Sequence, residues 1–82
     1  MKAVVLVRPK PGLLDPQGEA VGGSLRQLGF RVDDARVGRV VDLELEAASV
    51  ADARAEVERM CERLLANPLI EHFEIDVVED GR

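Results

Sequence analysis

The sequence predicts an α+β fold of β-α-β-β-α-β order, a two-layer sandwich in which an antiparallel, ferredoxin-like sheet carries two helices on one face. Three observations lead to this prediction. Apolar and polar residues alternate along 39–47 and 69–78, as in strands with one buried face. Two other segments repeat apolar residues at helical spacing, and each begins with a capping residue. The 82 residues suffice for a single domain, 1–82.

The first predicted strand and helix lie in residues 2–28. β-branched residues run through Lys2–Arg8, with apolar side chains on both faces, and Pro9 ends the strand. Residues 9–14 form a loop. A helix follows from Asp15 to about Leu28, because Asp15 is a good N-cap and Pro16 suits the first helical position. Its apolar stripe is Val21, Leu25 and Leu28, and Gly29 marks its end.

A hairpin is predicted next. Phe30–Val37 has the composition of a weak strand, although the pair Asp33-Asp34 interrupts it. Gly38 is a plausible turn. Arg39–Ala47 then alternates cleanly, with Val41, Leu43 and Leu45 facing inward and Asp42, Glu44 and Glu46 facing outward.

A second helix and a last strand complete the domain. Ser49 and Asp52 resemble a capping box. The stripe of the helix is Ala53, Val57, Met60, Cys61, Leu64 and Leu65, and Asn67-Pro68 ends it because a residue before proline avoids helical dihedrals. In the strand Leu69–Val78, the inward residues are Phe73, Ile75 and Val77, and the outward residues are His72, Glu74 and Asp76.

Right-handed crossovers place the first and third predicted strands in the centre of the sheet. The open face would then carry an apolar strip from the first strand between the carboxylates of its neighbours, which is typical of a protein interface. One edge of the domain gathers four cations around the start of the first helix, and such an edge suits an anion or an acidic partner. The candidate interface residues are Arg8, Lys10, Asp15, Gln17, Gly18, Arg36, Arg39 and Asn67.

Composition excludes several classes of protein. A net charge of −5 and two aromatic residues argue against nucleic-acid binding. No apolar run is long enough for a membrane span or a signal peptide, and one cysteine allows no internal disulfide, so we expect a cytoplasmic protein. His72 reads as a surface residue and Cys61 as a core residue, neither with the partners that catalysis or metal binding needs. We expect no catalytic or metal residues.

Five parts of the sequence together form a recognisable pattern: Leu14-Asp15-Pro16-Gln17-Gly18, Leu25 with Leu28-Gly29-Phe30, Arg36-Val37-Gly38-Arg39, Met60-Cys61-Glu62 and Leu64-Leu65-Ala66-Asn67-Pro68. With this pattern the chain resembles the PurS family, the small subunit of phosphoribosylformylglycinamidine (FGAM) synthase. The resemblance covers nearly the whole chain. Gly22-Gly23 departs from it, because bulkier helix formers are expected there.

The resemblance implies a non-catalytic subunit in purine biosynthesis. Its partners would be the synthetase subunit PurL and the glutaminase subunit PurQ, in a complex that uses ATP, Mg and glutamine to convert formylglycinamide ribonucleotide (FGAR) to FGAM. The chain itself would bind no cofactor. It would form a homodimer or tetramer, bridge the two larger subunits and assist ammonia transfer between them. The apolar sheet face would suit self-association, and the basic edge would suit contact with a larger subunit.

Two other classes share this element order. A dimeric ACT-like regulatory module would bind an amino acid or a nucleotide. An acylphosphatase-like enzyme would need an Arg-lined loop and a nearby Asn, and Arg8, Lys10 and Asn67 are candidates for those roles. The Pro-containing loop 9–14 and the acidic balance of charge argue against that enzyme.

Overall fold

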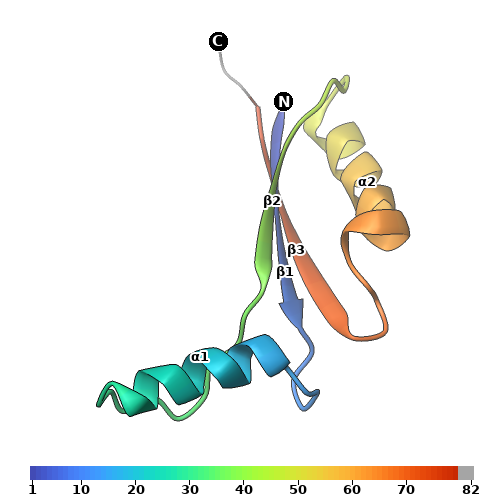
Figure 1. Ribbon diagram of the computed structural model, residues 1–82. Coiled ribbons are helices and arrows are strands. Elements are labelled where there is room, and N and C mark those ends of the chain that lie inside the picture. The colour runs from blue at the N-terminus through green and yellow to red at the C-terminus, as the bar shows by residue number, and fades with distance from the viewer. Residues whose placement is uncertain (80–82) are drawn as a thin grey trace.

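The computed structural model describes residues 1–79, and within them three strands and two helices follow one another (Figure 1). Residues 80–82 of the predicted domain 1–82 lie outside the described residues. The elements are β1 (Lys2–Pro9), α1 (Pro16–Gln27), β2 (Arg39–Glu44), α2 (Val50–Met60) with its π-helical continuation η1 (Cys61–Leu65), and β3 (Glu71–Val78).

The strands form one antiparallel sheet of order β2-β1-β3. Val5 of β1 lies opposite Val41 of β2 and Ile75 of β3, so the predicted inward residues share one face. The predicted alternation is confirmed, because inward residues of β2 and β3 are half-buried and their carboxylate neighbours are exposed. β2 ends at Glu44 rather than at Ala47, although Leu45 still exchanges two backbone hydrogen bonds with Met1.

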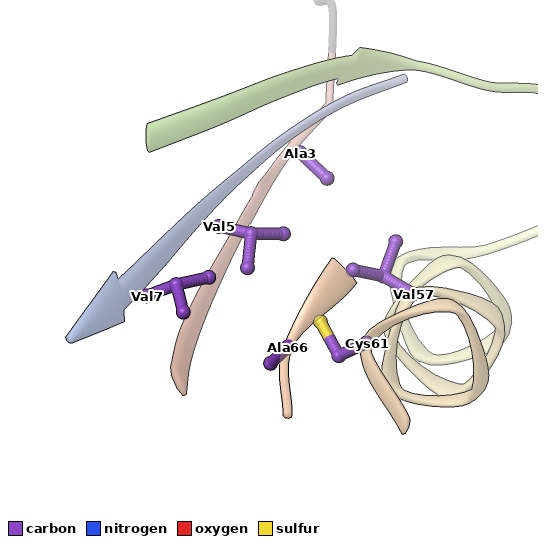
Figure 2. Close-up of a cluster of buried hydrophobic side chains, with 6 residues drawn as sticks. All are labelled: Ala3, Val5, Val7, Val57, Cys61 and Ala66. Carbon is purple, nitrogen blue, oxygen red and sulfur yellow. The ribbon is translucent and has the colours of Figure 1, made fainter. Parts of the chain in front are cut away.

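The core lies between this face and α2. Figure 2 shows Ala3, Val5 and Val7 of β1 pointing toward Val57, Cys61 and Ala66, and all six side chains are buried. Ser49 caps α2 by accepting a hydrogen bond from the Asp52 N–H at 3.1 Å, as predicted. Packing of an apolar helix stripe on the central strand therefore stabilises the domain.

One residue of the predicted stripe points the other way. Leu64 is 82% exposed, whereas Leu65 packs against the core. The reason is the π-helical turn η1, in which the Ala66 N–H bonds to the Cys61 carbonyl five residues earlier. The wider turn shifts the helical register, so that Leu65 and Ala66 face inward and Leu64 faces outward.

The α+β class and the antiparallel sheet are confirmed, but the first helix and the predicted strand at 30–37 differ from expectation. Residues 30–37 form no strand and instead run back along α1, where the Val32 carbonyl accepts a hydrogen bond from Arg26. α1 extends beyond the end of the sheet rather than covering the sheet beside α2 (Figure 1). We refer to residues 16–37 as the arm. β2 is consequently an edge strand.

The open face of the sheet, opposite α2, has the predicted character. Val4, Leu6 and Val40 form an apolar strip on it, because their cross-strand partners place them on the same side. Val4 lies between Asp42 and Asp76, one on each neighbouring strand. An apolar strip bordered by carboxylates favours a partner that supplies apolar contacts and positive charge.

Candidate partner-binding cleft

A cleft of about 550 Å³ lies where the arm joins the sheet. The end of β1, the loop before α1, the first turn of α1 and the start of β3 surround it. Its wall is mainly apolar, and Leu14 at its rim is 79% exposed. Four polar side chains border it: Asp15, Gln17, Arg39 and Glu71. An exposed apolar hollow with a charged rim is typical of a surface that receives another protein.

Asp15 fixes the direction in which the arm leaves the sheet. Its Oδ1 accepts a hydrogen bond from the Gly18 N–H at 3.0 Å, which is the predicted N-cap. Its Oδ2 accepts a second bond, also 3.0 Å, from the N–H of Val37, the last residue of the arm, where the chain returns to the sheet. These two bonds hold the pKa of the Asp15 carboxyl below its ordinary value, and the bond from Val37 contributes more than the bond from Gly18. One carboxylate therefore joins both ends of the arm.

Two glycines allow the close approach that this arrangement needs. A side chain at Gly18 would overlap the carbonyl oxygen of Ala35, and one at Gly38 would overlap the carbonyl oxygen of Val7. Gly18 therefore lets residues 30–37, the return segment of the arm, lie against the first turn of α1. Gly38 lets the chain pass close to β1. At the other end of α1, Gly29 (φ 97°) ends the helix as predicted. The Gly29 N–H donates to the Arg26 carbonyl, and the Phe30 N–H donates to the Leu25 carbonyl.

Arg39 and Glu71 form the charged side of the cleft. Two guanidinium nitrogens of Arg39 donate to the Glu71 carboxylate at 2.7 and 3.0 Å, and the guanidinium also bonds to the Leu65 carbonyl. Glu71 Oε1 further accepts a bond from the Asn67 N–H at 2.8 Å. The hydrogen bonds from Arg39 are the main reason that the pKa of Glu71 is lowered, and the bond from the Asn67 N–H lowers it further. This cluster links β2, the end of η1 and β3 across the central strand.

The structure brings together only part of the predicted basic edge. Asp15, Gln17 and Arg39 line the cleft, Gly18 is buried behind it, and Asn67 supports Glu71 from the turn. Arg8 lies on the open face beside Glu74 at 3.7 Å. Arg36 bonds to the Lys10 carbonyl and pairs with Asp34 at 3.5 Å.

Because Arg8, Arg36 and Arg39 each have a carboxylate partner, the edge is less basic than the sequence suggests. Among these four cations, Lys10 alone has no carboxylate of residues 1–79 within ion-pair distance. Asp15 also places a carboxylate at the first turn of α1, where it accepts the Gly18 N–H, and this negative charge argues against an anion site there.

Sequence analysis missed Glu71 and the role of Val37. Glu71 carries a signal that could have found it, since it has the inward parity of Phe73 and Ile75, and an acidic side chain in such a position needs a partner. Val37 participates through its backbone N–H, which no side-chain pattern marks.

The chemically reactive residues lie apart from the cleft. Cys61 is buried in the core, and burial, followed by Glu58 and Glu62, raises the pKa of its thiol. His72 is exposed on the open face. In residues 1–79, no three His, Cys, Asp or Glu side chains gather closely enough to hold a metal ion, and no helix is long and apolar enough to cross a membrane.

Comparison with known proteins gives a consistent result. The family model described as "PurS: Phosphoribosylformylglycinamidine (FGAM) synthase" matches residues 2–79. The FGAM synthase subunit PurS of Archaeoglobus fulgidus is 43% identical over 76 residues, which are 92% of this chain and 95% of that protein. The corresponding subunit of Bacillus subtilis is 39% identical over 79 residues, covering 95% and 93%.

Solved structures agree in fold as well as in sequence. Bacillus subtilis PurS superimposes with a TM-score of 0.85 at 40% identity, over 95% of this chain and 98% of that one. A chain in the structure of PurLQS from Thermotoga maritima gives a TM-score of 0.83 at 34% identity, over 92% and 93%.

Replacing Asp15 with Asn should lower the melting temperature at neutral pH, because an amide offers one neutral acceptor oxygen, whereas the carboxylate offers two oxygens that share a negative charge. The native pKa of Asp15 is lowered from its ordinary 3.8, so its stabilising effect is complete above that value and disappears as the pH falls through the native pKa. Thermal unfolding between pH 7 and pH 3 should therefore show the difference between wild type and Asp15→Asn narrowing at low pH. Asp33→Asn is the control; an equal effect of the two variants would contradict the role given to Asp15.

The same glycine substitution should have opposite effects at two positions of α1. Gly18→Ala should lower the free energy of unfolding by about 1–3 kcal/mol, because the new methyl overlaps the Ala35 carbonyl. Gly23→Ala meets nothing within 4 Å and should raise it by about 0.5–1 kcal/mol through helix propensity. Urea denaturation of both variants measures the two values, and a neutral Gly18→Ala would disprove the tight contact between α1 and the return segment.

Proposed function

This chain belongs to the PurS family, and we propose that it serves as the small, non-catalytic subunit of FGAM synthase in purine biosynthesis. In this role it bridges the synthetase subunit PurL and the glutaminase subunit PurQ. The observation that carries the proposal is its likeness, along nearly the full length of both chains, to a chain in the PurLQS structure. The same likeness favours this role over an ACT-like module or an acylphosphatase-like enzyme.

The chemistry of the proposed complex explains why such a subunit is useful. FGAR, glutamine and ATP become FGAM, glutamate, ADP and phosphate, and the ammonia released by PurQ must reach PurL. At neutral pH, ammonia in water becomes largely ammonium, which has no lone pair for attack. A sealed interface keeps ammonia neutral and close to its acceptor. A rigid adaptor can provide this seal without a reacting side chain of its own.

The described residues suit an adaptor. The free thiol of Cys61 is buried and His72 is solvated, so neither is placed as a nucleophile with its base. Within residues 1–79 no side-chain cluster could hold a metal ion, and ATP and Mg belong in our proposal to the rest of the complex. A cytoplasmic location, where a single free thiol stays reduced, is also part of the proposal.

Two surfaces are available for the larger subunits. The cleft offers an apolar hollow beside the Arg39–Glu71 pair, with Lys10 nearby on the preceding loop. The open face offers the strip of Val4, Leu6 and Val40 between carboxylates. These surfaces lie on different sides of the sheet, and a homodimer or tetramer would present each of them more than once. We assign the cleft to PurL.

Reconstitution tests the proposed function directly. Purified PurL and PurQ should form FGAM from glutamine at least about tenfold more slowly without this chain, which corresponds to about 1.4 kcal/mol in the barrier. Rates with added ammonium salt in place of glutamine should depend much less on the chain, because free ammonia needs no transfer. Full glutamine-dependent turnover by PurL and PurQ alone would refute the proposal.

Charge reversal tests the cleft. Lys10→Glu should weaken binding to PurL by about fivefold at low salt, since Lys10 has no carboxylate partner among residues 1–79, and the effect should shrink as salt is added. Lys2→Glu is the matched control, because Lys2 lies at the opposite end of β1. Isothermal calorimetry gives both affinities. Equal effects of the two variants would remove PurL from the cleft.

A further inference from the structure

Two carboxylates on the open face of the sheet take no part in holding the fold. The cations Lys2 and Arg8 of this face are each paired with a glutamate of a neighbouring strand, at 4.0 and 3.7 Å. Asp42 and Asp76 remain, both exposed, and within residues 1–79 neither carboxylate has an ion-pair or hydrogen-bond partner. Their charges are therefore available to another molecule.

The two carboxylates lie at the same level on opposite borders of the apolar strip. Val4 of the central strand is the cross-strand partner of Asp42 on β2 and also of Asp76 on β3. Because neighbouring strands lie about 4.8 Å apart, the backbones of the two aspartates are about 10 Å apart. Leu6 and Val40, which is 59% exposed, continue the strip beside Val4. The face thus has an apolar centre with one free negative charge on each border.

Two shallow hollows flank Val4. One of about 200 Å³ lies between β1 and β2 beside Asp42, and one of about 270 Å³ lies between β1 and β3 beside Asp76. Small-molecule sites usually have about 300–1,000 Å³ and enclose most of their ligand. Each hollow is smaller than that, so the pair suits side chains of a macromolecular partner better than a free metabolite.

Charge decides which macromolecule fits. Covering an unpaired carboxylate with apolar surface costs free energy unless the partner supplies a cation or another donor. The phosphates of nucleic acids and of anionic membranes would be repelled. A second copy of this chain, stacked on the same face, would bring Asp42 and Asp76 of both molecules together. The partner must therefore carry apolar side chains with cations on both borders.

An amphipathic helix meets this requirement. An α-helix with its side chains is about 10–12 Å wide, which matches the spacing of about 10 Å between the strands of Asp42 and Asp76. Laid on the strip above β1, such a helix places one of its borders over each carboxylate. Lys and Arg suit those borders, because their stems are apolar and only their ends are charged.

We propose that the open face receives an amphipathic helix of the glutaminase subunit PurQ, and that Lys or Arg side chains of this helix pair with Asp42 and Asp76. This inference rests on the proposed function, in which the chain bridges two subunits and the cleft binds PurL. The open face is a separate surface, formed by the middle of the three strands, whereas the cleft lies where the arm joins the sheet. One chain can therefore hold both subunits at once.

Removing the two carboxylates tests the charge pairing. When PurQ is titrated into a preformed complex of PurL with this chain, Asp42→Asn and Asp76→Asn should each weaken PurQ binding by about fivefold at low salt, and the double variant by about 20-fold. High salt should reduce these differences, and the affinity for PurL should not change. Glu58→Gln, which removes an exposed carboxylate from α2, is the control and should leave PurQ binding unchanged. Circular dichroism checks that each variant is folded.

A photo-crosslink identifies the occupant. p-Benzoylphenylalanine in place of Val40 should join the chain to PurQ in the assembled complex, within a helix that carries Lys or Arg. A crosslink to PurL or to a second copy, no crosslink, unchanged PurQ affinity of the double variant, or an equal loss in Glu58→Gln would each overturn the proposal.

Glutamine-dependent FGAM formation with wild type is measured separately. If wild type supports it while the open-face variants bind PurQ normally, the proposed function stands and only this interface is wrong. If wild type does not support it, the proposed function itself fails.

Discussion

The structure depends on one carboxylate. Asp15 lies between β1 and α1, and it accepts backbone hydrogen bonds from Gly18 within the helix and from Val37 at the end of the return segment. The first bond begins the helix, and the second joins that helix to the chain that enters β2. A charged acceptor strengthens both bonds, and the Gly18 N–H, in the first turn of a helix, would otherwise lack a partner. Its position determines where the arm points.

Several other features follow from this arrangement. With the arm directed away from the sheet, β2 becomes an edge strand. The face of the sheet that carries α2 is therefore left without a covering helix on its β2 side. The cleft forms at the junction, between the first turn of α1 and the Arg39–Glu71 pair. A small chain thus presents more surface than its core requires, which is an advantage for a protein whose proposed work is to hold others together.

The arginine side chains of the predicted basic edge form ion pairs with nearby carboxylates and do not make a region of net positive charge. Arg39 joins Glu71, Arg36 joins Asp34 and Arg8 joins Glu74, so the formal cation cluster of one edge becomes a set of local contacts. The Arg39–Glu71 pair has the best geometry, because two guanidinium nitrogens meet one carboxylate and the Asn67 N–H supports it. It also fixes the turn that connects η1 to β3.

The sequence by itself determined the features that depend on near neighbours: the faces of the strands, the Asp15, Ser49 and Gly29 helix boundaries, the inward stripe of α2 and the family. Local dihedral preferences and periodic burial encode all of these. The tertiary structure decided the rest. Whether 30–37 pairs with β2 or follows α1 depends on the Asp15–Val37 bond across 22 residues, and Arg39 finds Glu71 across 32. Such partners are chosen by how whole elements pack, because no local pattern specifies which distant group will be within reach.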